Sequence, residues 1–154
     1  MMIAKRLIVW AILASLAYAS LAGLAHQQAA HQSGVTMADI DCALAKGPVF
    51  IEFETAECGY CKQQRPITQQ LEAEYAGKAT FFYVDAMESR DLAKAFMVTG
   101  VPQMDIIAGK ADGRYTYIDR NGAPSDSIAA SRFLGLTQKD ALKKALDAAI
   151  KARK

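Results

Sequence analysis

Cys58 and Cys61 are the side chains of this sequence best suited to chemistry, and only Gly59 and Tyr60 lie between them. Two thiols at this spacing can form a redox-active disulfide, share a metal ion, or close a purely structural disulfide. A structural zinc site needs four Cys or His ligands, whereas the chain offers one further cysteine, Cys42, and two histidines near its N-terminus. A structural disulfide across so short a loop would constrain the unfolded chain little. The pair therefore favours redox exchange, with no metal or other cofactor.

The segments on either side of the pair indicate how it is held. Residues 49–53, VFIEF, form a nearly continuous apolar run, which is typical of a strand buried on both faces. An apolar residue then recurs every four positions and predicts a helix from about residue 59: Ile67, Leu71 and Tyr75. At the start of this helix, free backbone N–H groups and the helix dipole favour the Cys58 thiolate. We expect Cys58 to be the exposed nucleophile, and Cys61 to be buried one turn later and to resolve mixed disulfides.

The remaining elements alternate between helix and strand, which predicts an α/β fold with helices covering a central sheet. Capping pairs predict helix starts at Thr36 with Asp39 and at Thr137 with Asp140. The predicted helices span 37–46, 89–96 and the C-terminal segment with its Leu142, Leu146 and Ile150 stripe; strands are predicted at 80–85 and after Pro102. Strand candidates at 103–108, 114–119 and 127–133 are separated by Asp112-Gly113 and Asn121-Gly122. Both turns suit a hairpin, so the pairing stays open.

The N-terminal segment predicts export. Lys5 and Arg6 precede an uncharged run at 7–25, which is typical of a cleaved signal peptide or of a retained signal anchor; a buried soluble helix is the remaining alternative. Either main interpretation places the rest of the chain in the periplasm or another extracytoplasmic space, soluble or tethered through residues 7–25. Residues 26–36 are polar and predict a linker, in which His26 and His31 are solvated or chelate a metal. The domain itself is predicted at 37–154.

The overall charge of the chain indicates which classes of binding partner to expect. The formal net charge is +2, from 18 basic and 16 acidic residues. No strong positive field is available to neutralise phosphates, so a nucleic-acid partner is not expected. An apolar share of 52% suits one globular core and excludes a disordered or fibrous chain.

Residues 48–150 resemble the thioredoxin family. The resemblance lies in VFIEFETAECGYC, in Pro66 of the following helix, in YVDA at the end of the next strand, and in TGVPQ. It implies a thioredoxin fold, with a central mixed sheet flanked by helices and here preceded by an N-terminal apolar helix. It also implies a thiol–disulfide oxidoreductase that acts on protein thiols and disulfides and has a redox partner protein, such as a membrane electron donor. The Cys-Gly-Tyr-Cys sequence is similar to the active site of the bacterial periplasmic disulfide isomerase.

The resemblance also assigns roles to single residues. Cys58 matches the attacking cysteine and Cys61 the resolving one, while Glu52 matches a buried acid that moves protons for the resolving thiol. A carboxyl group within VFIEF should have a raised pKa if buried, although it could instead be solvated at an edge. Pro102 matches a cis-proline beside the sulfurs, and the Val101 backbone would pair with an extended substrate. With Gly59 and Tyr60, these two form the expected substrate-binding set.

Three residues depart from the family pattern or fall outside it. Glu57 replaces a tryptophan beside the first cysteine, and its charge should raise the pKa of Cys58. Phe81 stands where thioredoxins often carry a lysine that pairs with the buried acid, so Glu52 is expected to lack a cationic partner. Both predict a reductant or isomerase rather than an oxidant. Cys42 fits no family position; it is expected to be a small buried hydrophobe, with an intermolecular disulfide or a redox sensor as alternatives.

A second class of function stays open at this point. The domain could be a membrane-anchored, non-catalytic subunit or binding module of a larger complex, docking through the region around residues 109–133. Retention of Cys58, Cys61 and Pro102 favours the enzyme, because a binding module would not need them.

Overall fold

The computed structural model describes residues 34–153. In chain order its elements are α2 (Met37–Leu44), β1 (Val49–Glu54), α3 (Gly59–Glu74), β2 (Thr80–Asp85), α4 (Arg90–Ala95), β3 (Gln103–Ala111), β4 (Arg114–Ile118), β5 (Pro124–Ser125), α5 (Ile128–Ser131), β6 (Phe133–Leu134) and α6 (Lys139–Lys151). The predicted segment 1–25 and residues 26–33 of the predicted linker 26–36 lie outside the described residues. Within 34–153, no helix combines the length and apolar character required to cross a bilayer.

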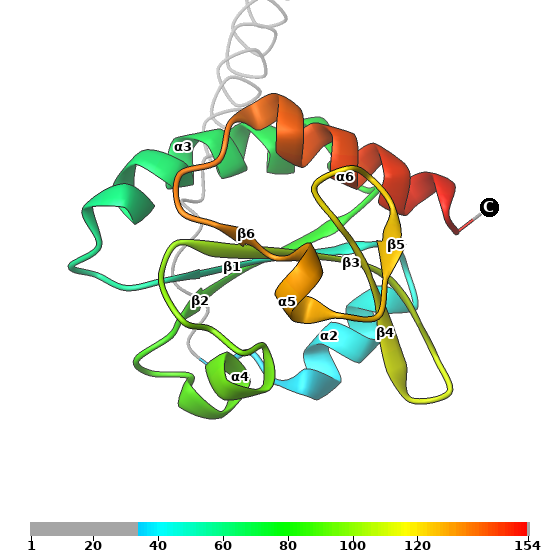
Figure 1. Ribbon diagram of the computed structural model, residues 1–154, viewed down its shortest axis with the longest axis horizontal. Coiled ribbons are helices and arrows are strands. Elements are labelled where there is room, and N and C mark those ends of the chain that lie inside the picture. The colour runs from blue at the N-terminus through cyan, green and yellow to red at the C-terminus, as the bar shows by residue number, and fades with distance from the viewer. Residues whose placement is uncertain (1–33, 154) are drawn as a thin grey trace, which may run out of the picture. The chain divides into compact units, whose positions relative to one another are not determined.

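The strands form one mixed sheet in the order β2-β1-β3-β4-β5, with β6 added beside β3 (Figure 1). β1 and β2 run parallel, because α3 carries the chain back across the sheet between them. β3 runs antiparallel to β1 and to β4. The predicted α/β architecture with a central mixed sheet is therefore confirmed.

Helices cover both faces of the sheet. In Figure 1, α3 and α6 lie on one side of the strands, and α2 and α4 lie on the other. β1 is central and every one of its six residues is buried. Alternate residues of a strand point to opposite faces, so Val49, Ile51 and Phe53 enter the cluster that also contains Leu92 and Phe96 of the α4 region. Phe50, Glu52 and Glu54 consequently point to the face covered by α3 and α6.

The hairpin left open by the sequence is β3–β4. Its turn is Asp112-Gly113, and both residues have positive φ, 51° and 76°, as a two-residue type I′ turn requires. The predicted strand at 127–133 is largely wrong, because Ile128–Ser131 forms the short helix α5 and only Phe133 continues into β6. The Ser127 side chain accepts a hydrogen bond from the Ala130 N–H and so caps this helix.

One predicted helix cap is confirmed and one is wrong. Thr36 and Asp39 form a reciprocal capping box at the start of α2. At α6 the N-cap residue is Gln138 and makes no side-chain cap. Thr137 is occupied elsewhere, because its hydroxyl donates to the Gly135 carbonyl and its N–H donates to Gln64 of α3.

Cys42 is not the buried hydrophobe that the sequence suggested. It is free and exposed on α2. The buried residues of this helix are Ile40, Ala43 and Leu44, which leaves position 42 on the outer face.

Candidate active site

The two cysteines occupy the junction between β1 and α3 and are joined by a disulfide. Cys58 is the N-cap residue of α3, in extended conformation, and its sulfur accepts a hydrogen bond of 3.0 Å from the Cys61 N–H. The chain must leave the buried strand and turn within a few residues, so the sulfur faces the unpaired N–H groups of the helix start. Cys58 is partly exposed, whereas Cys61 is only 2% exposed. The predicted order of exposure is confirmed.

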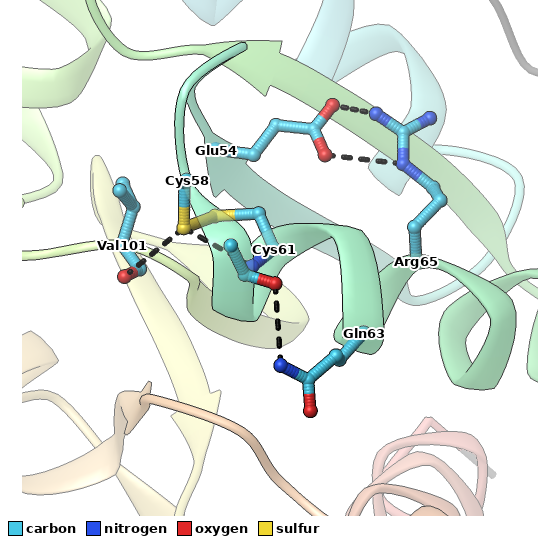
Figure 2. The surroundings of a disulfide bond; sticks show 7 residues. Glu54, Cys58, Cys61, Gln63, Arg65 and Val101 are labelled. Carbon is cyan, nitrogen blue, oxygen red and sulfur yellow. Dashed lines mark hydrogen bonds and ion pairs between the residues drawn. A yellow bond between two sulfur atoms is a disulfide. The ribbon is translucent and has the colours of Figure 1, made fainter.

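Val101 and Pro102 lie directly opposite Cys58. The Val101 carbonyl oxygen is 3.6 Å from the Cys58 sulfur (Figure 2). The peptide bond between Val101 and Pro102 is cis, as the sequence predicted. The Pro102 carbonyl accepts a hydrogen bond of 2.8 Å from the Gly135 N–H, so the segment is also held from its other side by the chain that enters α6.

Glu52 is fully buried on the α3 side of β1, six residues before Cys58. Neither carboxylate oxygen has a hydrogen-bond partner among the described residues. Burial raises the pKa of Glu52 to about 7, while the nearby Thr68 hydroxyl and the charge of Arg65 act in the opposite direction. The alternative of a solvated edge carboxylate is therefore excluded. A group that titrates near neutral pH can both take and return a proton under working conditions.

Arg65 and Glu54 form an ion pair beside the disulfide. This ion pair was not predicted from the sequence. The Arg65 Nε lies 3.1 Å from one Glu54 carboxylate oxygen, and an Arg65 Nη meets the other, so the contact is bidentate (Figure 2). The guanidinium also stands 4.0 Å from the ring centroid of Tyr83, the β2 neighbour of Glu52. A second carboxylate in an otherwise apolar strand was a signal that a cation had to be near.

Among the described residues no cation bonds to Glu52, although the charge of Arg65 acts on it. Phe81 supplies none, because its ring stacks on Phe50 at 4.9 Å between centroids. The charge that acts on Glu52 comes from α3, where Arg65 follows Cys61 by four residues and pairs with Glu54. The charge of Arg65 holds the pKa of Glu52 below the value that burial alone would give.

The two residues between the cysteines face outward. Gly59 and Tyr60 are both exposed, and Tyr60 keeps 63% of its surface accessible. Glu57 is exposed as well, directly before Cys58. Among residues 34–153, no three His, Cys, Asp or Glu side chains are grouped so as to hold a metal ion.

Comparison with known proteins identifies this combination of fold and site. The family model for thioredoxin matches residues 33–147. The chain belongs to the thioredoxin family. Its Cys58–Cys61 pair is accordingly that of a thiol–disulfide oxidoreductase.

Individual relatives of this thioredoxin-family chain agree with the family match. It is 34% identical over 94 residues to protein disulfide-isomerase tigA of Aspergillus niger. The matched region is 58% of this chain and 26% of that protein. It is 27% identical over 113 residues to a thioredoxin of Staphylococcus aureus, which covers 73% of the chain and 92% of that protein. Among solved structures, a mutant thioredoxin from Halobacterium salinarum superposes with a TM-score of 0.55 at 25% identity, covering 75% of this chain and 86% of that one.

The raised pKa of Glu52 has a measurable effect on stability. In the unfolded chain this acid has its ordinary pKa of about 4.5, whereas burial raises its pKa to about 7 in the folded protein. Between these two pH values the folded state binds more protons, so stability falls as the pH rises through this window and stays lower above it. We expect Glu52→Gln to remove this loss. Relative to wild type, its free energy of unfolding should rise by about 3 kcal/mol between pH 4 and pH 8.

Denaturant unfolding of the full-length chain at several pH values measures this difference. Asp105 also titrates near neutral pH, but it is present in both proteins and cancels in the comparison. A difference that stays constant with pH would show that Glu52 does not ionise near 7.

Proposed function

We propose that this protein is an exported thiol–disulfide oxidoreductase that exchanges disulfides with other proteins, and that it acts as a reductant or isomerase rather than as an oxidant. The observation that carries the exchange is the pairing of a partly exposed helix-capping sulfur, Cys58, with a buried one, Cys61, at the end of the strand that carries the buried acid Glu52.

The site supports a balanced two-step exchange. The Cys58 thiolate attacks one sulfur of a substrate disulfide, forms a mixed disulfide and releases the other substrate sulfur as a thiolate. Glu52 accepts the proton of the Cys61 thiol, and the Cys61 thiolate attacks the Cys58 sulfur. The second substrate thiolate leaves, so that the substrate disulfide is reduced while the cysteine pair is oxidised. In an isomerase, the released substrate thiolate attacks another disulfide of the same substrate instead.

The surface around Cys58 suits a protein substrate. Tyr60 and Leu134 are large apolar side chains with 63% and 43% of their surface exposed. Leu134 pairs with Gln103 across β6 and β3, next to the Val101–Pro102 segment. An extended substrate chain placed along Val101 would have apolar contacts on either side of the reacting sulfur.

The full-length chain should reduce insulin in the presence of dithiothreitol. Cys58→Ser should abolish the reaction because the remaining thiol, Cys61, is buried. Once freed of dithiothreitol, reduced Cys61→Ser should accumulate a mixed disulfide that can be isolated with the substrate. Turbidity of the precipitating insulin chains reports the rate. Wild-type activity no higher than that of Cys58→Ser would favour the non-catalytic binding module.

The reducing direction is inferred from the charges near Cys58. The exposed Glu57 carboxylate precedes it directly, and the nearby positive charge of Arg65 is already neutralised by Glu54. The Glu57 charge makes the Cys58 thiolate less stable, and the paired Arg65 does not compensate for it. A less stable thiolate favours the disulfide form of the protein and makes the dithiol a better electron donor.

Removal of the Glu57 charge should therefore shift the pair toward oxidation. We expect Glu57→Gln to lower the pKa of Cys58 and to raise the reduction potential against glutathione by about 10 mV, the scale of an exposed charge interaction. Asp112→Asn, at the far end of β3, serves as the control and should change neither. A Cys58 pKa near the ~3.5 of a strong oxidant in the wild-type protein would contradict the proposed direction.

Export rests on the sequence of residues 1–25, where Lys5 and Arg6 precede the apolar run. A domain tethered in this way could be recharged by a membrane electron donor, which is the redox partner we propose. N-terminal sequencing of the chain after cell fractionation tests this. We expect either a start after Ala19 or Ala25 in the soluble extracytoplasmic fraction, or an intact Met1 in the membrane. Recovery from the cytoplasm would overturn it.

A further inference from the structure

A second buried acid lies on the face of the sheet opposite Glu52. Asp105 of β3 is 1% exposed and pairs with Ile51 of β1, so it points toward the apolar cluster beneath α4. Burial raises its pKa to about 7, opposed by a hydrogen bond from Gln103 and by the charge of Arg132. A carboxyl group at such a position costs stability that an apolar side chain would not. The exchange mechanism at Cys58 and Cys61 does not use it.

Asp105 determines how the neighbouring Gln103 is oriented. The Gln103 side-chain nitrogen donates to an Asp105 carboxylate oxygen at 2.9 Å and to the Phe96 carbonyl at 3.0 Å. These two bonds use both protons of the amide. If the amide turned over, its oxygen would face a carboxylate and a carbonyl, so Asp105 favours the orientation that holds Phe96.

Arg132 holds the next carbonyl along the chain. Its guanidinium donates to the Met97 carbonyl at 2.9 Å, and its charge acts on Asp105. Met97 has a positive φ of 49°, a conformation that a non-glycine residue adopts only when its surroundings impose it. Gln103, Asp105 and Arg132, here called the Asp105 clamp, thus fix two successive carbonyls at the end of α4.

The fixed carbonyls lead directly to the active site. After Met97 the chain continues through Val98, whose N–H donates to the Ala93 carbonyl at 2.9 Å, to Val101 beside the Cys58 sulfur. Gln103 itself follows Pro102. The clamp therefore holds the segment 97–101 at its first residue and, through Gln103, two residues after its last.

We propose that Asp105 is a positioning residue for protein substrates: through Gln103 and Arg132 it holds the segment that presents the Val101 backbone beside Cys58. This inference rests on the proposed role of Val101 as the edge along which an extended substrate binds. A small disulfide that needs only the sulfur would be indifferent to the clamp, whereas a polypeptide substrate would not.

Asp105→Leu in the full-length chain tests this, because it removes the acceptor while filling the site with an apolar side chain of similar size. We expect the KM for a disulfide-bonded peptide to rise about tenfold, the equivalent of one lost hydrogen bond. The rate with 5,5′-dithiobis(2-nitrobenzoic acid) and the reduction potential should stay at wild-type values. Stability should change little, because the hydrogen bond that Gln103 loses offsets the gain from removing a buried ionisable group.

Ile107→Val is the matched control, because Ile107 is fully buried on the same face of β3 but touches none of the clamp bonds given above. It should lower stability modestly and leave the KM unchanged. Asp105→Asn, which keeps the shape of the side chain, should show the same selective pattern at a smaller size and serves if Asp105→Leu does not fold.

Hydrogen exchange separates this inference from the proposed function. The Val98 amide should exchange about tenfold faster in Asp105→Leu than in wild type, whether or not the protein reduces peptides. Wild-type KM and wild-type exchange in a folded Asp105 variant would overturn the proposal, as would equal losses with the peptide and with the small disulfide. If the wild-type protein reduces no peptide but the exchange changes as expected, the clamp stands and the substrate role of Val101 falls.

Discussion

The bond from the Cys61 N–H to the Cys58 sulfur is the contact on which the site depends. It exists only because a fully buried strand delivers its chain end to the first turn of a helix. β1 lies between β2 and β3, so it is held by ladders on both sides and packed on both faces. The sulfur is thereby placed at the positive end of α3 with little freedom to move. The Val101 carbonyl then faces a Cys58 sulfur that is already held in place.

The same rigidity explains why the two faces of the sheet have different tasks. Toward α3 and α6, β1 directs two carboxylates, one of which is neutralised by Arg65 while the other titrates near neutral pH. Toward α4, β3 directs Asp105 and Gln103, which act on the chain that precedes Pro102. The proposed proton transfer by Glu52 and the proposed substrate positioning by Asp105 are thus supported from opposite faces of the sheet.

Local patterns were enough to predict part of this arrangement. The alternating elements predicted the sheet, and the position of the cysteines between a strand and a helix predicted the order of exposure of the two sulfurs. The cis peptide was predicted from the family resemblance at residues 99–103. Glu52 could be expected to be buried because its neighbours in sequence are all apolar. These features depend on residues that lie close together in the chain, so a hydrophobic pattern or a short sequence motif is enough to predict them.

Features that depend on distant residues were missed. Arg65 and Glu54 are eleven positions apart and meet only once α3 has folded over β1. Thr137 looks like a helix cap, but Gln64 of α3 takes its N–H, and the helix begins later. The segment 127–133 has the composition of a strand, yet a serine cap turns part of it into a helix. In the first two cases a tertiary contact outweighs a local preference, whereas in the third a local serine cap outweighs the strand preference of the segment.

The two buried acids also change the proton content of the molecule. A count that treats every acid as ionised gives the chain a charge of +2. Glu52 and Asp105 are each about half protonated near pH 7, so the folded chain is about one unit more positive than that count. On unfolding near pH 7, the protons bound to Glu52 and Asp105 would be released to the solvent. The fold thus binds about one extra hydrogen ion near pH 7, shared between Glu52 on one face of the central strands and Asp105 on the other.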